Sequence, residues 1–302
     1  MLRELFLRVA ENERIQRAIL HRQCTRNAAR RFIAGETLAE AGRATRELAR
    51  RGMRASIAHV GEHVIDAAQA DASCAMHIET LRHIALEHLP ANISVKLSQL
   101  GLDIDAPLCE RHLENIAQEA YRLGMFVRID MESSAYTERT LQLCTRIHKQ
   151  YGNVGPVIQS YLYRSENDVR ALLPLGIRMR LCKGAYQEGP QAAFRRKAEV
   201  DANFVRLAQL LLGGGPHHAI ATHDPNMIDA VKAFAARESL PKHRFEFQML
   251  YGIRSDLQQQ LVREGYTVRI YVPFGEKWFG YFMRRLAERP ANLMFFLSHL
   301  RR

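Results

Sequence analysis

The sequence predicts a closed (β/α)8 barrel, an α/β fold of the TIM type, preceded by N-terminal helices. Three observations lead to this prediction. Short β-rich apolar runs alternate with amphipathic helical stretches after residue 54, and we count eight such runs, the strand number of the barrel. The chain has 302 residues, of which 47% are hydrophobic and 25% are charged, which suits one large globular domain.

The predicted strands are short and apolar. They are "ASIAHV" (55–60), "ISVKL" (93–97), "MFVRID" (125–130), "PVIQSY" (156–161), "IRMRLC" (177–182), "HAIAT" (218–222), "RFEFQM" (244–249) and "TVRIYV" (267–272). Strands that alternate with helices indicate a parallel sheet. A doubly wound open sheet is the alternative, but no GxGxxG follows the first strand.

Apolar positions at helical spacing predict an N-terminal helical segment over residues 1–54, so the barrel itself covers residues 55–302. Between the strands, helices are expected at 108–123, 137–151, 190–212, 225–238 and 276–288. Asp224 and Pro225 supply an N-cap acceptor followed by proline at the first helical position.

Charge and cysteine content narrow the class of protein. The formal net charge of +11 is compatible with a nucleic acid, an anionic membrane surface or an anionic ligand, but the charges are dispersed, so no nucleic-acid partner is expected. Five scattered cysteines indicate reduced thiols and a cytoplasmic protein. The N-terminus does not resemble a signal peptide. No HExxH or Cys/His finger spacing predicts a metal site.

In a (β/α)8 barrel the chemistry lies at the C-terminal ends of the strands. Charged residues there are costly unless they are paired or liganded. The polar and aromatic residues at the predicted strand ends are Lys96, Asp130, Glu132, Gln159, Tyr161, Arg180, Lys183, Tyr186, Thr222, His223, Asp224, Gln248 and Tyr271, with Leu250 beside them.

Several of these positions allow two interpretations. Lys96 is either a structural ion-pair partner or an anion contact, and His223 and Asp224 either cap a helix or lie at an anion-binding helix N-terminus. Asp130 and Glu132, two residues apart on a predicted strand, are expected to point the same way and to neutralise cations of the same rim. "RLCKGAY" (180–186) allows backbone N–H groups to approach a phosphate or a ring.

The last predicted helix carries Tyr281, Arg284, Arg285 and Glu288 on one face, at i, i+3, i+4 and i+7. One interpretation is a solvated Arg284–Glu288 pair of small value. The other is a pair of guanidinium groups that hold a carboxylate between aromatic walls, with Glu288 orienting one of them.

Eight motifs follow one another over about residues 55–300. They are "VGE", "ISVKLSQLG", "RIDMES", "IQSYLYRS", "RLCKGAY", "ATHDP", "FEFQMLYG" and "RIYVPFGEKWFGYFMRRLAERPAN". In this order they resemble the proline dehydrogenase family, the flavin enzymes that begin proline catabolism. The resemblance implies a (β/α)8 barrel that binds FAD non-covalently and oxidises L-proline to Δ1-pyrroline-5-carboxylate.

The resemblance also implies roles for individual residues. Asp130 and Arg180 match catalytic positions. The proline carboxylate is matched by Lys96, Arg284 and Arg285, and the walls around its ring by Leu250, Tyr271 and Tyr281. The flavin contacts match Met131, Gln159, Arg180, Lys183, Gly184, Ala185, Tyr186, Thr222 and His223. Glu62 matches an acid that pairs with Arg284 as a gate. The chain departs from the family pattern at Asp224, where asparagine is common.

The family further implies a membrane quinone as electron acceptor and a separate pyrroline-5-carboxylate dehydrogenase downstream. The "LMFFLSHLRR" tail and the basic charge then suggest peripheral contact with the inner face of the cell membrane, with packing of the tail on the barrel as the alternative. Other candidate functions are oxidation of 4-hydroxyproline, a flavin-free phosphate-binding barrel enzyme, and a non-enzymatic basic protein that binds nucleic acid or membrane.

We predict that Arg284→Met or Arg285→Met raises the KM for proline by orders of magnitude while flavin stays bound, because each removes a guanidinium that would hold the carboxylate. Steady-state kinetics and the flavin absorbance of each variant check this. An unchanged KM would show that the carboxylate is held elsewhere.

Overall fold

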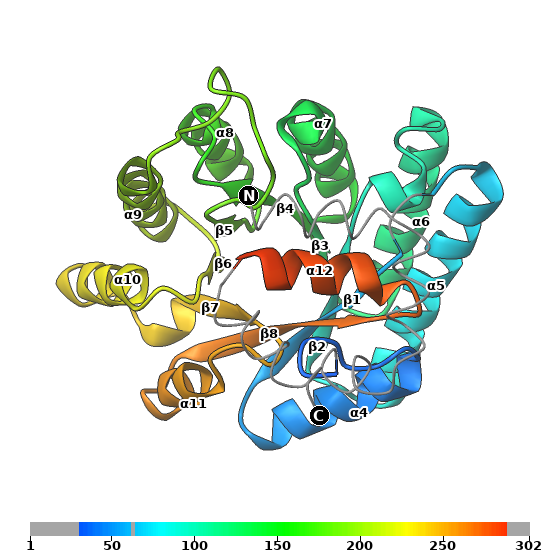
Figure 1. The fold of residues 1–302 in the computed structure, drawn as a ribbon, viewed down its shortest axis with the longest axis horizontal. Coiled ribbons are helices and arrows are strands. Elements are labelled where there is room, and N and C mark those ends of the chain that lie inside the picture. The colour runs from blue at the N-terminus through cyan, green and yellow to red at the C-terminus, as the bar shows by residue number, and fades with distance from the viewer. Residues whose placement is uncertain (1–29, 62–63, 289–302) are drawn as a thin grey trace.

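The computed structural model describes residues 30–61 and 64–288, and of residues 284–288 the backbone only. Eight parallel strands, β1 to β8, form a closed barrel in which each strand pairs with its neighbours in sequence order and β1 pairs with β8 (Figure 1). Helices surround the barrel (Figure 1). The predicted (β/α)8 fold is therefore confirmed.

Each strand overlaps one of the predicted apolar runs. The strands are β1 (Arg54–His59), β2 (Ala91–Val95), β3 (Val127–Ile129), β4 (Val154–Gln159), β5 (Arg180–Cys182), β6 (His218–Ala221), β7 (Phe245–Leu250) and β8 (Thr267–Phe274). β3 and β5 are shorter than their predicted runs, so Asp130 follows its strand and Arg178 precedes its strand.

Helices connect the strands, and four of those described begin at a side chain that accepts a hydrogen bond from a free N–H group of the first turn. The helices are α4 (Leu38–Arg50), α5 (Ala67–Leu86), α6 (Ala106–Arg122), α7 (Ser134–Tyr151), α8 (Ser165–Leu172), α9 (Lys197–Gly213), α10 (Pro225–Arg237), α11 (Ser255–Arg263) and α12 (Trp278–Glu288), with 3-10 turns η1 (Ser98–Leu100), η2 (Leu173–Leu175) and η3 (Lys242–Arg244). Asp66, Asp105 and Asp224 cap α5, α6 and α10, and Thr37 forms a capping box with Glu40 at α4.

The main hydrophobic core lies between the strands and the surrounding helices. Ile93, Phe247 and Leu207 are fully buried members of it. The interior of the barrel is different, because polar side chains from separate strands meet there. Ser56 of β1 and Arg180 of β5, for example, lie within hydrogen-bonding distance of one another. Since successive side chains of a strand point to opposite faces, each strand supplies an apolar outer face and a more polar inner one.

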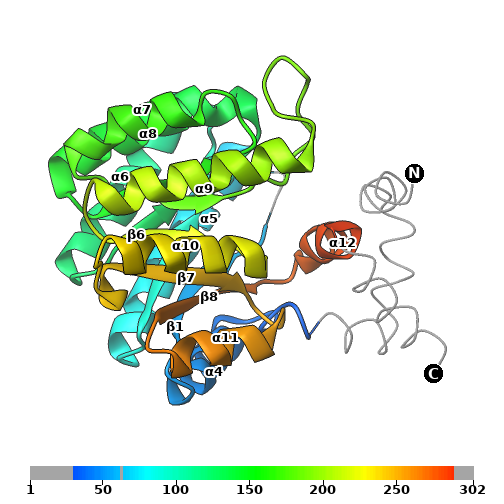
Figure 2. The ribbon, with the colours of Figure 1, turned by 90° about the vertical axis from the view of Figure 1, so that its left-hand side faces the viewer.

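Helix α12 lies beyond the C-terminal ends of the strands, over the middle of the barrel (Figures 1 and 2). A second apolar cluster holds it there, in which Phe279 and Phe282 are fully buried and pack with Phe32 and Ile33 from the segment before α4. The Trp278 indole Nε1 donates a hydrogen bond to Glu36. Residues 30–37 form a turn and loop, whereas the sequence predicted helix there.

None of the helices within the described residues is both long and apolar enough to span a lipid bilayer.

We expect Gly155→Ala to destabilise the barrel, because a Cβ at this position of β4 would lie 2.0 Å from the backbone oxygen of Arg178. Overpacking of this kind costs about 1–3 kcal/mol, and more where backbone has to move. Gly213→Ala is the matched control, since a Cβ at that position would meet no atom within 4 Å. Urea unfolding of both variants checks the expectation, and equal stability of the two would contradict it.

Candidate active site

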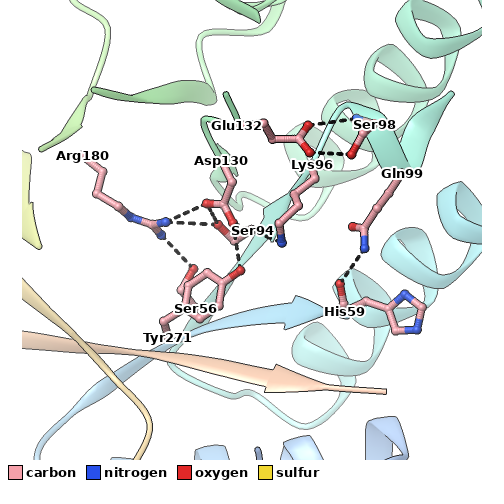
Figure 3. A network of polar contacts seen from close by, with 10 residues as sticks. All are labelled: Ser56, His59, Ser94, Lys96, Ser98, Gln99, Asp130, Glu132, Arg180 and Tyr271. Carbon is pink, nitrogen blue, oxygen red and sulfur yellow. Dashed lines mark hydrogen bonds and ion pairs between the residues drawn. The ribbon is translucent and has the colours of Figure 1, made fainter. Parts of the chain in front are cut away.

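The centre of the site is an ion pair between Asp130, which follows β3, and Arg180, the first residue of β5 (Figure 3). Arg180 Nη1 lies 2.8 Å from Asp130 Oδ1. The side chains of Asp130 and Arg180 are only 13% and 7% exposed, so both charges are largely removed from water. Such a pair is favourable only when further hydrogen bonds satisfy the remaining polar atoms.

Three hydroxyl groups surround the ion pair (Figure 3). The Ser94 and Tyr271 hydroxyls donate to the two oxygens of Asp130 at 2.6 and 2.8 Å. Arg180 donates to the hydroxyl oxygens of Ser94 and Ser56 at 3.3 and 3.4 Å. The guanidinium also lies 5.6 Å from the centre of the Tyr271 ring. The cluster thus unites residues from β1, β2, β5 and β8 with Asp130 at the end of β3.

The protonation states follow from this arrangement. Burial alone would raise the pKa of Asp130, but Arg180, Lys96 and the two hydroxyl donors bring it below its ordinary value. Burial and the neighbouring Asp130 carboxylate raise the pKa of Tyr271 well above its ordinary value. Asp130 is therefore a carboxylate and Tyr271 a neutral hydroxyl donor at neutral pH.

Lys96 lies at the same end of the barrel, with its Nζ 4.0 Å from Asp130 Oδ2. The sequence predicted that Glu132 points the same way as Asp130, but in the structure it does not. Its carboxylate accepts hydrogen bonds from the Ser98 hydroxyl and backbone N–H at 2.5 and 3.1 Å. That expectation is wrong because β3 ends at Ile129, so the alternation of a strand no longer applies beyond it.

The three predicted wall residues lie together. Tyr281 of α12 is 7% exposed and belongs to the apolar cluster under that helix, and Leu250 and Tyr271 pack against the same cluster. An apolar wall therefore stands next to the Asp130–Arg180 pair. Tyr271 belongs to both, since it packs against the wall while its hydroxyl binds Asp130.

The predicted flavin contacts Lys183 and His223 take part in polar contacts beyond β5 and β6. Lys183 Nζ lies 2.5 Å from Asp201 and 2.7 Å from Asp224. Asp224 also caps α10 through the N–H of Asn226, which supports the capping interpretation for this residue. His223 Nε2 accepts a hydrogen bond from the Leu250 N–H at 2.9 Å. The Asp224 charge is thus compensated by Lys183.

Gly184 turns the chain directly after Lys183. Its φ of +111° disfavours any side chain, and a Cβ there would lie 2.2 Å from the Tyr161 ring. The next two residues, Ala185 and Tyr186, are exposed, with Tyr186 37% exposed. Of the other predicted flavin contacts, Met131, Gln159 and Thr222 are all buried at the ends of β3, β4 and β6.

Four predicted site residues fall outside what the structure describes. Glu62 lies outside the described residues. Arg284, Arg285 and Glu288 belong to α12, but the structure describes only their backbone. Their proposed roles remain predictions. Within the described residues, no group of three His, Cys, Asp or Glu side chains is placed to hold a metal ion.

The sequence reasoning missed Ser56 and Ser94, which bind the ion pair directly. Each is a small hydroxyl residue flanked by apolar residues within its strand. Once the inward face of a strand is known from one charged residue, such as Arg180, alternation marks the hydroxyl residues on the other strands as candidates.

A polar cluster inside the C-terminal mouth of a closed (β/α)8 barrel, beside an apolar wall, defines a barrel enzyme. Comparison with known proteins refines this class. A family model described as proline dehydrogenase matches residues 41–297. This chain therefore belongs to the proline dehydrogenase family.

Three curated relatives match over most of their own length. Proline dehydrogenase 1 of Bacillus subtilis is 39% identical over 99% of this chain and 98% of its own length. Proline dehydrogenase 2 of the same organism is 41% identical over 90% of this chain and 89% of its own length. Proline dehydrogenase of Deinococcus radiodurans is 38% identical over 98% of this chain and 96% of its own length.

Among solved structures, proline utilization A from Bdellovibrio bacteriovorus, inactivated by N-propargylglycine, is similar with a TM-score of 0.83 and 26% identity. The match covers 87% of this chain but 33% of that longer one, so this chain spans about a third of that protein.

We predict that Asp130→Asn and Arg180→Met each destabilise the protein by about 3 kcal/mol, because each leaves a buried charge without its partner. The double variant is expected to lose clearly less than the sum of the two. Urea unfolding of the native protein and the three variants gives the free energies of unfolding for this double-mutant cycle. Additive losses would mean that the two side chains do not stabilise one another.

Proposed function

We propose that this protein oxidises L-proline to Δ1-pyrroline-5-carboxylate with a non-covalently bound FAD at the C-terminal mouth of the barrel. The observation that carries the proposal is the Asp130–Arg180 ion pair, with Lys96 and Tyr271 beside it. This pair lies next to the apolar cluster under α12. Membership of the proline dehydrogenase family supports the same substrate.

The site suits a small zwitterion that has an apolar ring. The proline carboxylate requires cations when it leaves water, and Lys96 would bind it together with Arg284 and Arg285 from α12. Leu250, Tyr271 and Tyr281 would then contact the ring and exclude water from it. The main contribution of these residues is to fix the ring in one orientation.

Asp130 is poorly suited to act as a base, because its pKa is lowered and both of its oxygens already accept hydrogen bonds. Its proposed role is to hold Arg180 and the Tyr271 hydroxyl in place. The proline nitrogen must therefore lose its proton by another route before the adjacent C–H bond breaks.

The residues present fit a flavin. Arg180 Nε is buried without a hydrogen-bond partner among the described residues, which leaves a donor for an acceptor atom of the cofactor. The turn at Gly184, which the exposed Ala185 and Tyr186 follow, would lie against the cofactor. Further contacts would come from Met131, Gln159, Lys183, Thr222 and His223. When bound, FAD would supply the acceptor for the hydride, which carries both electrons that proline loses.

We infer that a membrane quinone takes the electrons and that a separate pyrroline-5-carboxylate dehydrogenase oxidises the product further. Under this proposal the protein works in the cytoplasm, with peripheral contact to the inner face of the cell membrane.

The proposal predicts that the purified protein is yellow and that its flavin band bleaches when L-proline is added without oxygen. Asp130→Asn should retain flavin yet lose about 100-fold in kcat/KM, because Arg180 and Tyr271 lose their common anchor. Asp229→Asn, at an exposed position on α10, is the matched control and should keep full activity.

A colourless protein that does not take up FAD would overturn the proposal. Bleaching by 4-hydroxyproline but not by proline would reassign the substrate. An Asp130→Asn variant with full activity would remove Asp130 from the active site.

A further inference from the structure

A cavity of about 480 Å³ opens at the other end of the barrel. Its wall includes residues from the starts of several strands, among them Arg54 of β1, Asn92 of β2 and Glu246 of β7. Because all the strands are parallel, these residues mark the N-terminal mouth of the barrel. None of the residues assigned to the candidate active site lines this cavity.

The wall of the cavity carries an excess of positive charge. It contains Arg54, Arg128, Arg178 and Arg269, whereas Glu246 is the one carboxylate among its described lining residues. That carboxylate is already engaged, because Arg269 Nε lies 2.8 Å from Glu246 Oε1. Although burial opposes ionisation, Arg269 and the hydrogen bonds around it lower the pKa of Glu246 to about 2. Three arginines therefore remain without a compensating charge among the described residues of the wall.

Arg128 of β3 is the most unusual of these arginines, because it is only 4% exposed. Its Nη1 donates to the carbonyl oxygens of Pro156 and Arg178 at 2.9 and 2.6 Å, which are uncharged acceptors. Among the described residues, its Nε has no hydrogen-bond partner and no carboxylate forms an ion pair with the guanidinium. Burial, with Arg180 nearby, lowers the pKa of Arg128 to about 9.

A buried cation that lacks an anionic partner is costly unless a ligand supplies one. Phe126 fixes the position of this cation, since the Arg128 and Arg178 guanidinium carbons lie 4.8 and 5.3 Å from the centre of its ring. Both guanidinium groups therefore pack against the same ring at the cavity wall. Guanidinium groups suit oxyanions because their N–H donors form forked hydrogen bonds.

Two hydrogen-bond acceptors in the same cavity wall limit the kind of ligand that could bind there. Glu246 Oε2 and Asn92 Oδ1 are buried and have no hydrogen-bond partner among the described residues. A bare anion would repel both atoms. A phosphate group that retains one proton carries several anionic oxygens for the arginines and one hydroxyl donor for such an acceptor.

We propose that the N-terminal mouth of the barrel binds a phosphate group, either inorganic phosphate or a phosphate ester of a small metabolite, through Arg54, Arg128 and Arg178. This site is separate from the proposed proline site and does not depend on that assignment. A phosphate bound there would place a negative charge near Arg128, whose own charge interacts with that of Arg180.

Isothermal titration of the full-length, flavin-loaded protein at constant ionic strength tests the proposal. The probes are inorganic phosphate, glycerol phosphate and succinate. We expect saturable binding of the phosphate probes at one site per chain, and the tighter of the two identifies the source. Arg178→Gln, an exposed position, should weaken binding at least about 10-fold.

Arg111→Gln, at an exposed arginine of α6, is the matched control for loss of one positive charge and should bind as the native protein does. Arg128→Met provides a second variant and should also weaken binding. The proposal fails if no phosphate probe gives saturable heat, if Arg178→Gln binds as the native protein does, or if succinate alone binds.

Discussion

The buried ion pair between Asp130 and Arg180 is the contact on which the rest of the candidate active site depends. Two opposite charges inside a barrel are stable only if their other polar atoms are satisfied. The Ser94 and Tyr271 hydroxyls donate hydrogen bonds to the carboxylate. The Ser56 and Ser94 hydroxyl oxygens accept hydrogen bonds from the guanidinium. Through Tyr271 the pair is linked to the apolar wall under α12, so one contact orients both the polar and the apolar side of the site.

The pleat of the strands explains why the barrel is polar at both ends. Side chains two residues apart point to the same face, so a strand that places one residue among the catalytic candidates places another in the layer below it. Arg54 and Ser56 of β1 are related in this way, as are Arg269 and Tyr271 of β8. The two layers influence one another, because the Arg180 charge contributes to the lowered pKa of Arg128.

Much of this arrangement was predictable from sequence, because short apolar runs and strand-end charges are local signals. The eight strands follow from them, and so does the placement of Asp130, Arg180 and Tyr271 at one end of the barrel. The direction of Glu132 was not predictable, since it depends on where β3 ends. Neither was the loop over residues 30–37, because its conformation is set by packing on a helix about 250 residues later in the sequence.

That packing has a consequence for the proposed substrate site. Phe32 and Ile33 pack with α12, and Gly252 allows the segment before them to approach, since a Cβ there would lie 1.6 Å from the Arg31 carbonyl oxygen. The helix that carries Arg284 and Arg285 is therefore positioned by apolar contacts with the segment before α4. The residues proposed to contact the cofactor are instead held by strand-end charges such as Lys183 and Asp224. Because these two sets of contacts are physically different, a change in the loop over residues 30–37 should alter substrate affinity with little effect on the flavin side.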